Sequence, residues 1–167
     1  MTTNISKASA NKFQLIFPKL PHLDDFGSLK QFSLNVIDGI LPSFSLDVLD
    51  LPYKGGNMKI ENGFGEFGDW TTTFAIDSSF QSWIVMSDWI FSIANNKAKH
   101  GYVDQSYSVD AHYHILDNFN NQVVEIKFEN LWPSNLDQVQ HSYQDNPGVL
   151  TCGVTFSYDR FYRVVSS

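Results

Sequence analysis

Regular alternation of apolar and polar residues constrains this chain more than any other feature. Between positions 150 and 158, apolar residues occupy every second position, with mostly threonine, glycine and serine between them. Successive side chains of a β-strand point to opposite faces of the sheet, so this pattern predicts a strand with one buried and one solvated face. Similar alternation predicts further strands in 13–17, 32–36, 44–48, 70–76, 107–115 and 124–128. Such one-sided strands are typical of antiparallel sheets.

One segment has the spacing of an α-helix instead, and we expect that helix at about residues 79–95. Ser78 and Gln81 have the spacing of a capping box at its start, and Asn95-Asn96 is a suitable stop signal. Apolar positions recur with a period close to 3.6, which predicts one face packed on a sheet. The residues of that predicted face are Phe80, Trp83, Ile84, Ser87, Ile90, Phe91 and Ala94.

Glycine residues interrupt the segment from Pro52 to Gly68, which indicates a long loop or an extended hairpin. We also expect a loop at Trp132-Pro133 and a final strand that ends at Tyr158.

Together these patterns predict a mainly β fold: an antiparallel β-barrel or sandwich with one flanking α-helix and a long Gly-rich loop. We expect a single domain over residues 1–167, in which residues 1–11 form a loose N-terminal arm. The one cysteine, Cys152, lies in an apolar alternation and is expected in the core.

The clearest enzyme-like pattern is Asp110-x-His112-x-His114, whose polar residues share one face of a predicted strand. Two imidazoles two positions apart could bind one metal ion, with Asp110 as a third ligand. However, the sequence contains no second motif of this kind. We therefore expect no catalytic residue, no cofactor and no bound metal.

The chain has 18 acidic and 11 basic residues, a formal net charge of -7. A nucleic-acid-binding surface would be basic, so this balance argues against specific binding of nucleic acid. It is compatible with a surface that nucleic acid passes without adhering. The sequence has neither a run of about 18 apolar residues nor a secretory signal, which predicts a protein that folds in a cytoplasm.

From Pro52 onward, an ordered set of motifs resembles the tail tube proteins of contractile-tailed bacteriophages. The set comprises Pro52-Tyr53-x-Gly55, Lys59, Asp69-Trp70-Thr71-x-Thr73, Trp89 in the expected helix, Leu131-Trp132-Pro133, and a last strand rich in threonine and aromatic residues. The resemblance implies a non-enzymatic subunit that assembles into hexameric rings, which stack into the inner tail tube and form the channel for DNA passage.

The resemblance also implies partners and a location. The partners would be the tail sheath protein, a baseplate tube initiator, a tail terminator, and phage DNA that passes through the lumen without specific binding. The location would be the virion tail, assembled in the host cytoplasm.

Two sets of residues follow as candidates from the resemblance. For contacts between rings, the candidates are Pro52, Tyr53, Lys54, Gly55, Gly56, Lys59, Gly63 and Gly65. For the lining of the lumen, the candidates are Thr71, Thr73, Thr151, Thr155, Ser157 and Asp159.

Alternative functions remain open from the sequence. Within the same fold, the chain could be a baseplate-proximal tube initiator or adaptor, or the tube subunit of a contractile injection or type VI secretion system. From another class, a β-barrel that carries a small ligand also fits the strand pattern.

Overall fold

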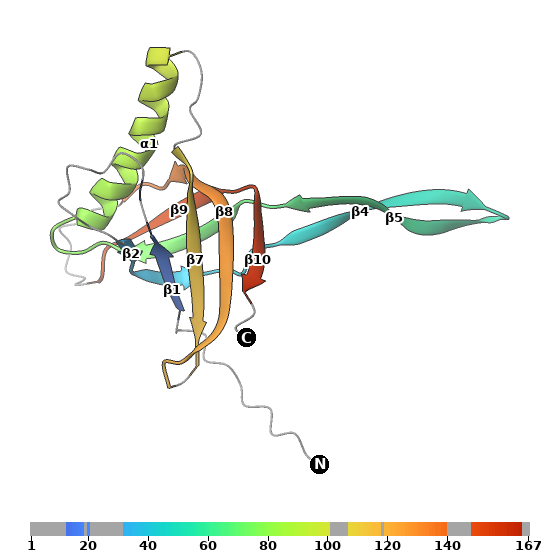
Figure 1. Cartoon of the computed structure of the whole chain (residues 1–167), viewed down its shortest axis with the longest axis horizontal. Helices are drawn as coiled ribbons and strands as arrows, with labels where there is room; N and C mark the ends of the chain where they lie inside the picture. The colour runs from blue at the N-terminus through green and yellow to red at the C-terminus, as the bar shows by residue number, and fades with distance from the viewer. Residues whose placement is uncertain are drawn as a thin grey trace.

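The computed structural model describes residues 13–18, 20, 32–100, 107–117, 119–139 and 148–164. The expected N-terminal arm lies outside these residues. Eight strands form one antiparallel sheet in the order β2-β1-β7-β8-β9-β6-β3, and β10 also pairs with β8 (Figure 1). Their bounds are β1 (Phe13–Phe17), β2 (Phe32–Leu34), β3 (Val36–Gly39), β6 (Trp70–Ala75), β7 (Val109–Leu116), β8 (Gln122–Leu136), β9 (Thr151–Ser157) and β10 (Arg160–Val164).

The long strand β8 connects the two layers of the sandwich. Its first part pairs with β7 and β10, and its last part pairs with β9. The expected loop at Trp132-Pro133 is therefore wrong, because both residues lie within β8, opposite Ser157 and Phe156. The register shifts between Pro133 and Asn135. Such a bulge is one of the few places where a sheet accommodates a proline, which has no N–H to donate.

Aromatic side chains from both layers form the core. The Trp70 ring stacks on Phe128 at 4.7 Å and on Phe156 at 5.8 Å between ring centroids, and all three side chains are buried. Cys152 is buried in the same cluster, as expected. The sheet order runs from β2 to β3 without closing, so the fold is a sandwich rather than a closed barrel.

Helix α1 (Gln81–His100) flanks this sandwich, longer than the expected 79–95 (Figure 1). The predicted buried face is wrong in part, since Phe91 is 61% exposed and the deepest side chains are Val85, Met86 and Trp89. Apolar residues occur on most sides of the helix in its first turns, so the spacing of apolar residues did not determine which side of the helix is buried. Trp89 packs edge-on against Phe17 at 5.7 Å and donates its indole N–H to the Tyr107 carbonyl at 2.7 Å.

Asp77, rather than Ser78, caps this helix. Its carboxylate accepts hydrogen bonds from the backbone N–H of Ser82 at 2.9 Å and of Gln81 at 3.2 Å, and from the hydroxyls of Ser79 and Ser82. These donors, led by the Ser79 hydroxyl, hold the pKa of Asp77 well below its ordinary value. The backbone turns into the helix at Phe80, whose φ is 56°.

The strand over 150–158 is not the last one in the chain. It corresponds to β9, after which a short turn at Tyr158-Asp159 leads into β10. β10 lies antiparallel to β8, with Arg160 opposite Glu129 and Val164 opposite Glu125.

Candidate assembly surfaces

The segment expected as a long Gly-rich loop is a regular β-hairpin that projects from the sandwich as an arm (Figure 1). Its strands are β4 (Phe44–Tyr53) and β5 (Gly56–Phe67), and among the described residues they pair only with each other. Lys54 and Gly55 form the tip with φ values of 37° and 90°. Two positive φ values in a two-residue connection are the signature of a type I′ turn, whose twist matches that of paired strands.

The outer half of this hairpin has one apolar and one polar face. Residues directly opposite each other in an antiparallel pair share a face. Leu49 pairs with Ile60 and Leu51 with Met58, so these four side chains lie on the same face. We call this set, together with Tyr53, the apolar face of the hairpin.

Opposite it lies the polar face, where Asp50 pairs with Lys59, Pro52 with Asn57 and Val48 with Glu61. Lys59, a candidate for contacts between rings, therefore lies directly opposite Asp50 of its own hairpin.

The apolar face of the hairpin is exposed. Leu49, Leu51, Tyr53 and Met58 are between 39% and 59% exposed. A two-stranded hairpin is marginally stable in water by itself, and contiguous exposed apolar side chains of this kind mark contact sites for other proteins. The face therefore has the chemistry of a surface that packs against a partner.

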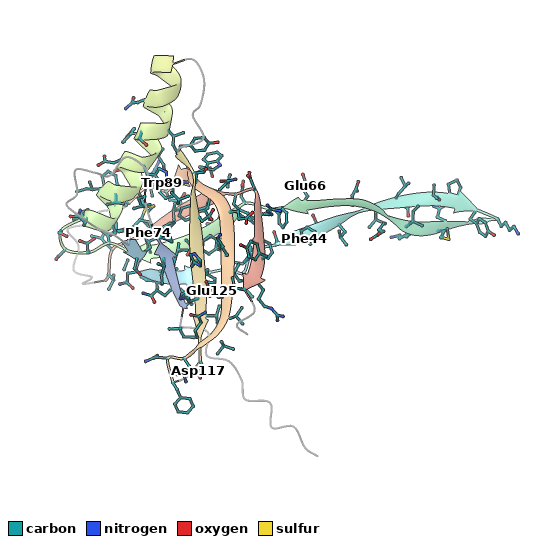
Figure 2. The ribbon with its side chains drawn as sticks, viewed as in Figure 1. Phe44, Glu66, Phe74, Trp89, Asp117 and Glu125 are labelled. Carbon is teal, nitrogen blue, oxygen red and sulfur yellow. The ribbon has the colours of Figure 1, made fainter. Side chains whose placement is uncertain are left out.

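Aromatic packing holds the base of the hairpin on the sandwich. Phe67 contacts Phe44 at 5.0 Å, Phe161 of β10 at 5.4 Å and Tyr158 at 6.1 Å between ring centroids. Figure 2 shows Phe44 and Glu66 where the arm leaves the body. The Phe44 ring lies over Gly65, in space that a β-carbon on Gly65 would occupy. This explains one of the glycines that made the segment look like a loop.

Another glycine of the candidate loop set marks an irregularity in the ladder. The register shifts between Leu46 and Val48, opposite Gly65 and Glu61, and Gly63 in that interval has a φ of 73°. Glycine adopts this left-handed conformation without steric cost. Of the candidate set, Pro52 through Gly56 and Lys59 lie toward the tip, whereas Gly63 and Gly65 shape the arm nearer its base.

A second surface is the polar face of β6 and β9. The hydroxyl oxygens of Thr71 and Thr155 are 3.2 Å apart, Thr73 lies opposite Gly153, and Ser157 donates to Asp69 at 2.7 Å. The structure thus brings five of the six lumen candidates to one face: Thr71, Thr73, Thr151, Thr155 and Ser157.

Asp159, the sixth candidate, lies in the turn after β9. Its carboxylate accepts a hydrogen bond from the Asn130 amide at 2.6 Å.

Sequence reasoning missed Asp137, whose carboxylate lies over Gly153 and whose N–H donates to the Gly153 carbonyl at 2.9 Å. The Asp137 carboxylate occupies the space that a β-carbon on residue 153 would need, so this position requires glycine. The alternation of apolar and polar residues did not reveal this requirement. The named side chains on this face are hydroxyls and carboxylates, so none of them brings a positive charge that would attract phosphate.

The histidine pattern forms a different cluster from the expected one. His112 and His114 lie on one face of β7, but Glu125 of β8 joins them instead of Asp110. His112 Nδ1 is 2.6 Å and His114 Nε2 is 3.7 Å from Glu125 Oε1. The hydrogen bond with His112 lowers the pKa of the Glu125 carboxyl.

Asp110 is engaged elsewhere, with Lys127 Nζ at 2.8 Å. Burial is the largest single influence and raises the pKa of Asp110. The hydrogen bonds from Lys127 and from the Asn130 N–H, together with the charge of Lys127, outweigh burial, so the pKa of that carboxyl is lowered.

A sandwich with an exposed apolar face on a projecting arm is typical of a structural subunit that packs against other proteins. The sequence matches the phage tail tube protein family over residues 8–164. This match covers most of the chain, so the chain belongs to the phage tail tube protein family. The tail tube terminator protein of Enterobacteria phage T4 is 26% identical over 147 residues, which covers 85% of this chain and 82% of that protein.

Several solved structures share the fold. A chain from the sheath/tube terminator of an extracellular contractile injection system, PVC, superposes with a TM-score of 0.68 at 13% identity, covering 98% of this chain and 100% of that one. A chain from the tube terminating cap of the anti-feeding prophage superposes with a TM-score of 0.67 at 11% identity. The match covers 99% of this chain and 96% of that one. Hcp1 of E. coli EAEC 042 superposes with a TM-score of 0.55 at 12% identity, and the match covers 90% of this chain and 88% of that one.

Within the described residues, no helix combines the length and the apolar character needed to span a membrane.

Proposed function

We propose that this protein is a structural subunit that ends the inner tube of a contractile phage tail, as a tube terminator. The observation that carries the proposal is its similarity to the T4 tail tube terminator, which extends over most of both chains. This role differs from that of the repeating tube subunit, which the sequence motifs favoured. It is a tube-associated role, nearer to the initiator or adaptor considered as an alternative.

In this proposal the subunits form a ring through contacts between sandwich edges and projecting hairpins. The apolar face of the hairpin, with Leu49, Leu51 and Met58, packs against a neighbouring subunit or the last ring of the tube. Burial of this face removes exposed apolar area from water, at about 25 cal/mol per Å². The ring then contacts the tube on one side, and the tail sheath protein is a further partner.

The polar face of β6 and β9 lines the channel in this proposal. Thr71, Thr155 and Ser157 offer hydroxyls, while Asp69 and Asp137 offer negative charge close by. Phosphates bind to Lys and Arg side chains, so a lining of this composition lets DNA pass without specific binding. The protein has no enzymatic role in this account and acts in the virion tail.

A second candidate is the repeating tube subunit in hexameric rings. It is supported by the family to which the chain belongs. The two roles differ in what the protein does to a growing tube, because a terminator stops elongation whereas a repeating subunit continues it.

Tube length distinguishes these roles. The test adds the purified protein, in amounts far below those of the tube protein, to tubes growing from the tail's repeating subunit, and electron microscopy measures their lengths. A terminator shortens the tubes, and gold-labelled protein is found at their ends. Label along the whole length would support the repeating role, and tubes that neither shorten nor carry label would contradict both.

A further inference from the structure

A cluster of two imidazoles and one carboxylate lies on the outer face of β7 and β8, outside both assembly surfaces. His112 Nδ1, His114 Nε2 and a carboxylate oxygen of Glu125 all lie within 4.8 Å of one another. Figure 2 marks Glu125 on the sandwich body, away from the projecting hairpin.

The backbone fixes where these three side chains lie. His112 and His114 are two residues apart on β7, and Glu125 is directly opposite His114 on the neighbouring strand. The side chains are between 19% and 28% exposed, so a small ion can reach them from solvent. Gln122 donates to Glu125 Oε2 at 2.9 Å, which orients the carboxylate and leaves Oε1 directed at the two imidazoles.

A positive charge beside the cluster would oppose the binding of a cation, so the partner of each nearby ammonium matters. Lys127 lies opposite His112 in the ladder, so its side chain shares the face of the cluster. That ammonium is paired with Asp110 at 2.8 Å, so its charge is balanced by a carboxylate outside the cluster.

We propose that His112, His114 and Glu125 bind one divalent zinc ion. Two imidazole nitrogens and one carboxylate oxygen form a common ligand set for zinc, with bonds of about 2.0–2.2 Å and a fourth position open to water. Tetrahedral coordination at such bond lengths places ligand atoms roughly 3.4 Å apart. Small side-chain rotations therefore suffice: the His112–Glu125 hydrogen bond opens and His114 moves closer. This proposal replaces the sequence-based expectation that no metal binds.

Zinc at this position would join β7 to β8 through side chains of both strands, in addition to the backbone ladder. Binding stabilises the folded state because the unfolded chain does not hold the three ligands together. The proposal does not depend on the role of the protein in the tail.

Calorimetric titration of zinc chloride into protein without a histidine tag, after treatment with a chelator, tests the proposal. We expect one zinc ion per chain and a rise in the unfolding temperature. His112→Ala and Glu125→Gln should each weaken binding at least tenfold, since loss of an outer-shell partner alone typically costs 10- to 100-fold in metal affinity. Glu129→Gln is the matched control: Glu129 lies on the same strand and face but pairs with Arg160, so the variant should bind zinc like the original protein.

Cobalt provides a second measurement on the unaltered protein. Co²⁺ in a site of this kind should give the visible absorption of a tetrahedral complex, and one equivalent of zinc should abolish it. Absence of saturable zinc binding would overturn the proposal, as would equal affinity in the original protein and in both ligand variants. A cobalt spectrum of a fully hydrated ion would also overturn it.

Discussion

At the scale of single residues, Asp77 shows how one side chain determines where the helix begins. Its carboxylate accepts from two backbone N–H groups of the first helical turn and from two serine hydroxyls. The sequence offered Ser78 for this role because Ser78 and Gln81 have capping-box spacing. Spacing did not reveal that the chain turns at Phe80, with a φ of 56°, and thereby brings the preceding aspartate to the helix end.

Asp77→Ala should destabilise the protein by about 1 kcal/mol at neutral pH, the usual cost of losing a helix N-cap. The measurement is urea unfolding followed by circular dichroism. Ser78→Ala is the matched control and should change the free energy of unfolding by less than about 0.5 kcal/mol, as is usual for a surface substitution.

The contribution of Asp77 should also depend on pH. The folded state lowers the pKa of Asp77 below its ordinary value of 3.8. A lowered pKa means that the stabilisation is fully present above the unfolded-state pKa and is lost as the pH falls through the folded-state pKa. The difference in stability between the original protein and Asp77→Ala should therefore be constant above about pH 5 and shrink below about pH 4. A difference that grows on acidification would contradict this assignment.

At the scale of elements, alternation predicted strands well where one face is buried within the chain itself. It identified β9 and the polar face of Thr151, Thr155 and Ser157, because burial of the other face enforces the pattern. It was less informative for the β4–β5 hairpin, whose glycines indicated a loop. No described side chain of that hairpin is buried, so burial within the chain does not enforce its pattern.

Leu51→Asp tests the apolar face of the hairpin. The folded monomer should keep its stability within about 0.5 kcal/mol, since Leu51 is exposed there. Assembly should weaken strongly, because the interface would bury an unpaired charge. Sedimentation velocity measures the assembled fraction.

Asn57→Asp is the matched control for this prediction. It adds the same charge to the same hairpin, but on the polar face, where Asn57 lies opposite Pro52. We expect assembly close to that of the original protein. Equal loss of assembly in both variants would mean that charge on the arm, rather than the apolar face, is responsible.

The polar face of β6 and β9 can be tested by reversing its chemistry. Thr155→Lys places an ammonium among the hydroxyls of Thr71 and Ser134. If this face lines the channel, assembled rings should gain affinity for DNA, and that affinity should fall as salt is raised. Fluorescence anisotropy with labelled DNA measures it. Unchanged DNA binding by assembled Thr155→Lys protein would place the face outside the channel.

At the scale of the whole molecule, the sandwich and its projecting hairpin make different contributions. Aromatic side chains from both layers, with Trp70 between Phe128 and Phe156, form a core that a single chain can bury. The hairpin leaves apolar side chains in water. The sequence motifs were sufficient to predict the family and a mainly β fold with one helix, because both depend on features within the chain. The proposed position of the protein in the tail depends on contacts with other subunits, and such contacts leave little signal in one sequence.

Negative-stain electron microscopy of the purified protein over a range of concentrations tests the central claim most directly. The account predicts closed rings with a central channel, formed at high concentration or on addition of tail tubes, and predicts that the rings are lost in Leu51→Asp. Single small particles at every concentration, with and without tubes, would contradict the claim that this chain assembles through its exposed hairpin.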